Sequence, residues 1–250
     1  MPCVVQLPDR KVIFFAKWLV RQFAPADQQI GMHWHRYHPE TLPSMIDTTL
    51  TPKPIAQKFT LVYLHFENLN ETVALLQQLK REHFVLYSPN VKIETQHRNV
   101  YIYPLSKSGF RYHLQSCRRV ICNTGFEFIT EAIHLGLPVL TKPLQGQYEQ
   151  MANAKALKQL QLASVVRNIG VLTLDKFVSL EQQSPQQHYP DVAAALANYC
   201  VQQLDVAITH RQAKESRIQL SEQLWNGQNV NQRFTSNEFH PIQSQKMIAA

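Results

Sequence analysis

The sequence predicts an α/β fold built on a parallel β-sheet with flanking helices. Two observations predict it. Between residues 59 and 103, short apolar segments rich in β-branched and aromatic residues alternate with an amphipathic helical pattern. Between residues 119 and 160 the order strand, helix, strand, helix appears again. Such alternation is typical of parallel sheets, because parallel neighbours need a long crossover and that crossover is usually a helix.

The elements ahead of residue 119 follow from local patterns. Phe59 to Phe66, Phe84 to Tyr87 and Val100 to Tyr103 predict strands, and Leu69 to Arg81 predicts an amphipathic helix. Prolines and threonines in residues 39–58 predict a linker. We therefore expect residues 1–38 to be the edge or remnant of another domain, residues 59–224 to be the α/β domain, and residues 225–250 to be an irregular tail.

Residues 119–141 predict a β-α-β unit. The strand Arg119 to Cys122 ends in Asn123-Thr124-Gly125, a turn whose glycine is free to take a positive φ. A helix follows from Phe126 to Leu135; Gly136 suits its C-terminal cap, and a strand from Leu137 to Thr141 comes next. The turn then lies at the carboxyl edge of the sheet, where open α/β sheets bind ligands. Backbone N–H groups of residues 124–126 would face an anion there.

Glu131 and Thr130 lie one turn further into this helix. A carboxylate repels phosphate, so Glu131 is better suited to accept hydrogen bonds from the vicinal hydroxyls of a ribose. Two plainer interpretations stay open. Glu131 can be a solvated helix carboxylate, and Thr124-Gly125 can be an ordinary turn that touches no ligand.

The segment resembles the carboxyl-terminal, donor-binding half of GT-B glycosyltransferases, especially the peptidoglycan N-acetylglucosaminyltransferases and related bacterial and archaeal two-domain enzymes. Five linked features carry the resemblance: Thr124-Gly125, Thr130-Glu131, Gly136-Leu137-Pro138-Val139-Leu140, Glu149-Gln150 and Asn153-Ala154. The resemblance implies a Rossmann-like domain that binds a nucleotide diphosphate sugar.

By resemblance, the Gly125 turn would hold the diphosphate, Glu131 the ribose, and Glu149-Gln150 the sugar hydroxyls. The full set expected to contact the donor is Thr124, Gly125, Phe126, Thr130, Glu131, Gln147, Glu149, Gln150 and Asn153. Backbone groups of Pro104, Leu105 and Ser106 would line the nucleobase. Residues 147–160 also predict a good amphipathic helix, so Asn153 can equally be a helix-surface residue.

The chain departs from the family pattern in two places. Phe66-Glu67-Asn68-Leu69 follows the first strand where the peptidoglycan enzymes have a Gly-Gly-Ser turn. Only residues 1–38 precede the linker, whereas a GT-B enzyme has an amino-terminal domain that supplies the acceptor surface and the general base. We therefore expect a fragment, or a partner polypeptide that supplies this lobe, and we name no catalytic residue.

Composition narrows the remaining choices. The net charge of +7 is dispersed, which argues against a nucleic-acid interface but allows attraction to nucleotide diphosphates or an anionic membrane surface. Seven glycines in the whole chain exclude Walker and dinucleotide loops. The opening residues lack the pattern of a signal peptide, and the four cysteines lack zinc-ribbon spacing. We expect a cytoplasmic protein without cofactor or essential metal.

The histidines His33, His35 and His38 allow a zinc hypothesis, since His33 and His35 would share a strand face. No acidic or thiolate partner is adjacent, so a packed hinge or an edge of the acceptor cleft is favoured. Trp34 and Tyr37 would then pack, or stack on a sugar.

The function predicted from the sequence is transfer of a hexose from a nucleotide diphosphate sugar, with uridine as the expected base, to an acceptor that the sequence does not specify. The alternative is a non-catalytic or partner-dependent donor-binding subunit, or a relic. A UDP-sugar epimerase is less favoured, because its paired acid and base carboxylates have no first domain to carry them.

Overall fold

The computed structural model describes residues 29–51, 58–179, 186–204 and 210–226. The described residues fall into two compact units: unit 1 comprises those between 50 and 186, and unit 2 comprises residues 29–49 together with those between 187 and 226. Each unit is described by itself. The early residues 1–28 and most of the predicted tail, residues 227–250, lie outside the described part of the chain.

Unit 1 is built on a seven-stranded sheet in the order β5-β6-β4-β3-β7-β8-β9. All neighbouring pairs are parallel except β5 with β6, which pair antiparallel at one edge. The strands are β3 (Thr60–Tyr63), β4 (Phe84–Tyr87), β5 (Thr95–His97), β6 (Val100–Tyr103), β7 (Arg119–Asn123), β8 (Val139–Lys142) and β9 (Ser164–Val165). The predicted α/β class with a parallel sheet is confirmed.

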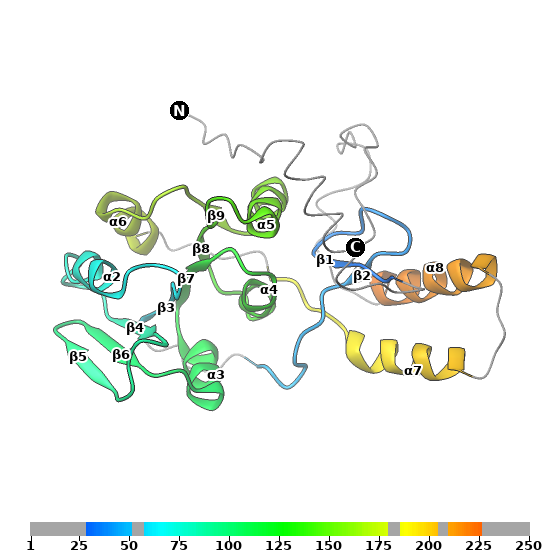
Figure 1. Ribbon diagram of the computed structural model, residues 1–250, viewed down its shortest axis with the longest axis horizontal. Helices are drawn as coiled ribbons and strands as arrows, with labels where there is room; N and C mark the ends of the chain where they lie inside the picture. The colour runs from blue at the N-terminus through cyan, green and yellow to red at the C-terminus, as the bar shows by residue number, and fades with distance from the viewer. Residues whose placement is uncertain (1–28, 52–57, 180–185, 205–209, 227–250) are drawn as a thin grey trace. The chain divides into compact units, whose positions relative to one another are not determined.

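Helices cover both faces of this sheet. Figure 1 shows α2 and α6 on one side, and α3, α4 and α5 on the other. Their bounds are α2 (Leu69–Leu76), α3 (Lys107–Ser116), α4 (Phe126–His134), α5 (Tyr148–Gln159) and α6 (Val171–Ser179). The chain leaves β3 towards β4 by way of α2, and later leaves β7 in the other direction, towards β8, by way of α4. The strand order therefore reverses between β3 and β7, which makes that crevice the topological switch point of the sheet.

One cluster of core residues lies between the sheet and the layer of α2 and α6. Alternate strand residues face it, among them Val62, Phe84 and Ile121, and Leu76 and Leu174 meet them from the two helices; each is 1% exposed or less. Burying a side chain of this kind contributes roughly 1.5–3 kcal/mol. The apolar strand segments predicted from the sequence are thus the elements that hold the fold together.

Sequence reasoning missed α3, β5 and β9. Helix α3 is mostly polar and has a glycine, Gly109, in its first turn, and both features disfavour a helix prediction from the sequence. Its start is fixed locally instead, because the Ser106 hydroxyl accepts a hydrogen bond from the Gly109 N–H at 3.2 Å. Strands β5 and β9 are three and two residues long, too short for alternation to be visible.

Two details of the β-α-β unit test the local predictions. Gly136 takes the left-handed conformation at φ 71° just after α4, as predicted for a C-terminal cap. Gly125 does not use its freedom to take a positive φ: this residue is extended, with φ −73° and ψ 154°, because it serves as the N-cap of α4. The buried thiol of Cys122 packs in β7, and burial raises its pKa to about 12.

Unit 2 contains the two-residue strands β1 (Met32–His33) and β2 (Leu42–Pro43), with helices α7 (Val192–Leu204) and α8 (His210–Asn226). Its core joins Leu42 to Val192 and Leu224. The Thr41 carbonyl accepts hydrogen bonds from the Ser221 hydroxyl and the Trp225 indole, both at 2.7 Å.

This organisation differs from the expected boundaries. Residues 39–49 pack as part of unit 2 instead of forming a linker, and α7 and α8 belong to that unit instead of to the α/β domain. The apolar Leu42 supplies the physical reason, since it is fully buried against the two helices. None of the described helices combines the length and apolar character needed to cross a bilayer.

Candidate functional site

The switch point between β3 and β7 brings three loops to one edge of the sheet. Residues 64–68 follow β3, residues 124 and 125 follow β7, and residues 143–147 follow β8. Because β3, β7 and β8 are parallel neighbours, their carboxyl ends lie side by side. Most residues predicted to bind the donor come from the second and third of these loops and the helices after them.

The helix α4 begins at this edge without a side-chain cap. Gly125 is its N-cap, and a Cβ placed there would meet no atom within 4 Å. A helix N-terminus carries partial positive charge and attracts anions. The space beside Gly125 is therefore open to a ligand. The absence of a side chain keeps this space free, whereas the φ of Gly125 does not require a glycine.

The backbone N–H groups of the turn are less available than the sequence predicted. The Thr124 N–H donates to Gln150 Oε1 at 3.1 Å, and the Gly125 N–H donates to the Asn123 carbonyl at 2.9 Å. Two of the three groups expected to face an anion are thus occupied within the protein. Fewer backbone donors are therefore left for an anion at this edge.

Gln150 and Asn153 tie the turn to α5. Besides the Thr124 N–H, Gln150 Oε1 accepts the Leu144 N–H at 3.0 Å, and Asn153 Nδ2 donates to the Thr124 carbonyl at 3.3 Å. The Thr124 hydroxyl also pairs with that of Thr141 at 2.8 Å. Gln150 and Asn153 are 5% and 8% exposed, so Asn153 is not a helix-surface residue. The structure brings these predicted residues together as a frame that shapes the turn.

The side chains of Thr130 and Glu131 differ in how deeply they are buried. The Thr130 side chain is fully buried, and its hydroxyl donates to the Phe126 carbonyl at 2.8 Å within α4. Glu131 is half-buried on the second turn of the same helix. Phe126 is likewise half-buried, whereas Gln147 and Glu149, at the start of α5, are exposed.

Three residues that the sequence analysis did not assign to the donor site occupy the switch point itself. Lys142 Nζ donates to Glu67 Oε2 at 2.8 Å, and both side chains are largely buried, with 21% and 25% exposure. Asn123 Nδ2 donates to the Lys142 carbonyl at 3.3 Å and approaches Glu67 Oε1 at 3.5 Å. Asn123 Oδ1 is buried without a hydrogen-bond partner. We call Glu67, Asn123 and Lys142 the edge cluster.

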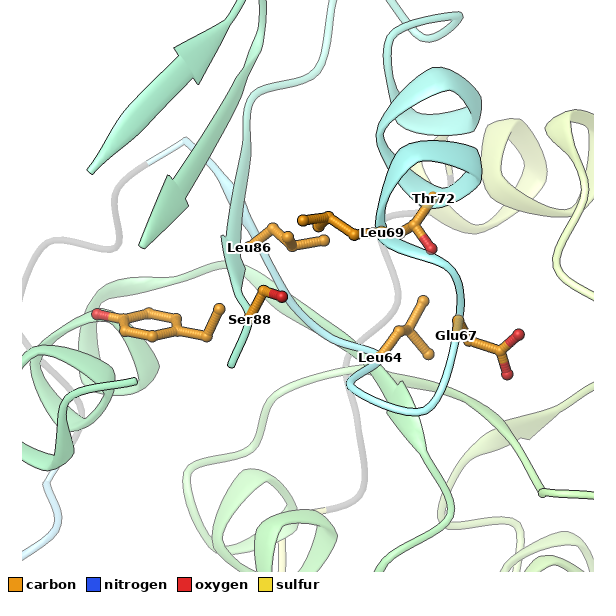
Figure 2. Close-up of a pocket in the computed structure, with 7 residues that line it drawn as sticks. Leu64, Glu67, Leu69, Thr72, Leu86 and Ser88 are labelled. Atoms are coloured by element: carbon orange, nitrogen blue, oxygen red, sulfur yellow. The ribbon is translucent and has the colours of Figure 1, made fainter. Parts of the chain in front are cut away.

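A small pocket lies next to the edge cluster, between the loop after β3 and the end of β4 (Figure 2). It is lined by Leu64, Glu67, Leu69, Thr72, Leu86, Tyr87 and Ser88 and encloses about 10 Å³, room for one water molecule. Figure 2 shows the Glu67 carboxylate pointing away from Leu86 and Ser88. The carboxylate thus turns away from the pocket, and its Oε2 pairs with Lys142 instead.

The expected nucleobase segment follows β6. Pro104 is half-buried, whereas Leu105 and Ser106 are exposed. Ser106 uses its hydroxyl to cap α3. A larger hollow of about 290 Å³, lined by Lys58, Phe59, His83, Val85, Tyr101, Tyr103 and His113, includes residues that precede β3 and β4. It reaches the amino edge of the sheet and is separate from the switch point.

The histidines of unit 2 are engaged with aromatic rings. His33 contacts Trp34 and Tyr37 edge-on at centroid distances of 5.4 and 4.8 Å, and its Nδ1 accepts the His35 N–H at 3.3 Å. Burial lowers the pKa of His33 to about 4, with a further contribution from His35. Trp34 is 1% exposed. Within the described ranges, no group of three His, Cys, Asp or Glu side chains is arranged to hold a metal ion.

Comparisons with solved structures give glycosyltransferases at low identity. The glycosyltransferase SnogD from Streptomyces nogalater matches with 15% identity and a TM-score of 0.41, over 64% of this chain and 45% of that one. MurG from Acinetobacter baumannii matches with 17% identity and a TM-score of 0.38, over 52% and 43%. The spinosyn rhamnosyltransferase SpnG complexed with thymidine diphosphate matches with 15% identity and a TM-score of 0.37, over 81% and 50%. The chain thus spans half or less of each of these structures.

The comparison with curated proteins gives no match. The family model described as glycosyl transferase family 1 matches residues 35–180, which is more than half of the 250 residues and includes the whole carboxyl edge of the sheet. The chain belongs to glycosyl transferase family 1.

Proposed function

We propose that unit 1 binds a nucleotide diphosphate sugar at the switch point and that the protein takes part in transfer of the sugar to an acceptor. The observation that carries the proposal is the uncapped start of α4 beside an open space at Gly125, in the crevice where the strand order reverses. Family membership supports it. In this proposal the donor is a UDP-hexose.

In this proposal each predicted residue either contacts the donor or supports the turn that shapes the site. Gly125, Phe126 and the start of α4 receive the diphosphate, Glu131 accepts the ribose hydroxyls, and Glu149 and Gln147 reach the sugar. Thr124, Thr130, Gln150 and Asn153 hold the turn in shape through their hydrogen bonds. The backbone of Pro104, Leu105 and Ser106 lines the base. The leaving diphosphate is stabilised by the dipole of α4, which costs no reorganisation because the helix is already in place.

A saturation-transfer NMR screen of the full chain with UDP-, GDP- and TDP-sugars tests the proposal. Contact with the uracil and ribose protons of UDP-glucose or UDP-N-acetylglucosamine, and weaker contact with the other two nucleotides, is the expected result. Silence from all three donors contradicts donor binding. Equal contact with all three supports the diphosphate site and removes the uridine assignment.

The second candidate is donor binding without transfer by this chain alone, with a partner polypeptide completing the enzyme. It is favoured by the state of Glu67: the carboxylate at the switch point is held by Lys142 and is poorly placed to take a proton from an acceptor hydroxyl. Hydrolysis of a UDP-sugar that binds in the NMR screen separates the two candidates. Release of UDP by the purified chain supports a complete catalyst, and binding without release supports the partner-dependent subunit.

A further inference from the structure

We propose that Lys142 is the cation that receives the donor diphosphate, and that Glu67 holds its ammonium group at the switch point until the donor displaces the carboxylate. The inference rests on the proposed function and adds two residues to its site. Neither residue belongs to the set of positions that the family resemblance indicates.

The first argument is position. Lys142 ends β8 and is the register partner of Asn123, which ends β7. Glu67 reaches the pair from the loop after β3, 75 residues earlier in the chain. The edge cluster therefore lies across the carboxyl ends of the three strands that border the crevice, where a ligand of this fold must lie.

The second argument is charge. A diphosphate brings at least two negative charges to the start of α4. Of the backbone groups there, the Thr124 and Gly125 N–H groups already donate within the protein. The helix end supplies only about half an elementary charge. Lys142 supplies a full positive charge at the same edge. It is the basic member of the edge cluster.

The third argument concerns Glu67. Its carboxylate neutralises Lys142 at 2.8 Å, so a diphosphate and Glu67 compete for the same ammonium group. Removing the carboxylate should leave the cation unpaired and favour an anion, whereas removing the cation should leave the carboxylate to repel it. Asn123 Oδ1, buried and without a hydrogen-bond partner, shows that the cluster is not fully satisfied as it stands. A purely structural ion pair predicts no such opposite effects.

The test is calorimetric titration of the full chain with two probes, UDP and inorganic pyrophosphate. Lys142→Met removes the charge and keeps the length of the chain, and Glu67→Gln keeps the shape of Glu67 and removes its charge. Lys142→Arg retains a cation, and Lys176→Met, on the exposed surface of α6, is the matched control. Circular dichroism checks that each variant is folded.

We expect Lys142→Met to weaken both probes about tenfold or more, as loss of a charge-assisted hydrogen bond would. Glu67→Gln should tighten both by a few-fold, on the scale of one partly exposed charge pair. Lys142→Arg should bind within about threefold of wild type, and Lys176→Met should match wild type. If Lys142→Met does not fold, Glu67→Gln tests the inference alone, because it should tighten binding of both probes.

The outcomes separate this inference from the proposed function. Wild-type UDP binding that Lys142→Met leaves unchanged, or that Glu67→Gln weakens, overturns the role of the edge cluster and leaves donor binding standing. If pyrophosphate binds in a Lys142-dependent way and UDP does not bind, the anion site is supported and the assignment of a nucleotide is overturned. Binding of neither probe overturns both proposals.

Discussion

At the scale of single residues, Gln150 shapes the site more than its place on a helix suggests. One amide oxygen accepts the N–H groups of Thr124 and Leu144, which belong to the loops after two neighbouring strands. The residue pair Glu149-Gln150 was predicted to grip a sugar as a unit, but the two side chains face different surroundings: Gln150 is buried and Glu149 is exposed. The alternation follows from adjacent positions on a helix, which point in directions about 100° apart.

Gln150→Ala should destabilise unit 1 by about 2 kcal/mol, because two backbone N–H groups lose their acceptor. Urea unfolding followed by circular dichroism measures the change. Gln159→Ala, an exposed position on the same helix, is the control and should change the free energy of unfolding by less than about 0.5 kcal/mol. Equal effects of the two substitutions would contradict the role of Gln150 as a clamp.

His33 makes the stability of unit 2 depend on pH. Its pKa is about 4 in the fold and 6.5 when unperturbed, so the unfolded chain binds the proton first as the pH falls. Stability is fully present above pH 6.5 and falls as the pH drops towards 4, by up to about 3 kcal/mol. Burial lowers the pKa of His35 as well, which acts in the same direction.

The measurement is urea unfolding at pH 7 and pH 5, followed by tryptophan fluorescence, since Trp34 and Trp225 both belong to unit 2. His33→Gln should lose less stability between the two pH values than wild type does. An unchanged difference would show that folding does not lower the pKa of His33.

At the scale of elements, the start of α4 lacks the stability that a capping side chain would add, and the proposed diphosphate site offers a reason. Gly125 lacks a capping side chain, although the helix that it starts would be stabilised by one. Gly125 has an extended conformation that any residue adopts, and a Cβ there meets nothing within 4 Å. A glycine is therefore not required by the backbone at this position, which fits a need to keep the space clear.

Gly125→Asp should stabilise unit 1 by up to about 1 kcal/mol, through a cap and a favourable charge at the helix start. The same carboxylate should weaken UDP binding about tenfold or more, because it occupies and repels the diphosphate position. Urea unfolding and calorimetry measure the two effects. Gly125→Asn, an uncharged cap, should stabilise similarly and weaken binding less. Unchanged UDP affinity in Gly125→Asp would place the diphosphate elsewhere.

The helices and strands also show which parts of the fold can be predicted from sequence patterns. The apolar strands β3, β4, β6, β7 and β8 and the helices α2, α4 and α5 were predicted because burial imposes a period that is visible locally. Helix α3 was missed because a polar sequence is held by a cap and by contacts from elsewhere. The Lys142–Glu67 pair was missed for a different reason. Its two residues are 75 positions apart in the chain, and they meet because of the order of the strands in the sheet, which local sequence patterns do not reveal.

At the scale of the whole molecule, all the residues assigned to the donor lie in unit 1, whereas the family match begins at residue 35, within unit 2. Unit 2 has a core and hydrogen bonds of its own. Sequence reasoning placed its helices with the sheet because their apolar stripes do not reveal which partner covers them. The donor assignment does not depend on that boundary, since its geometry is set by one parallel sheet.

The central claim is that the carboxyl edge of this sheet binds a nucleotide diphosphate through Glu131 and the start of α4. Calorimetric titration of the full chain with UDP tests it most directly, with Glu131→Ala as the variant and Asp175→Ala, on exposed surface of α6, as the control. Wild type and Asp175→Ala should bind UDP equally, and Glu131→Ala should bind it about ten to a hundred times more weakly, since a carboxylate that accepts ribose hydroxyls is lost. UDP affinity that is the same in all three proteins would contradict the claim.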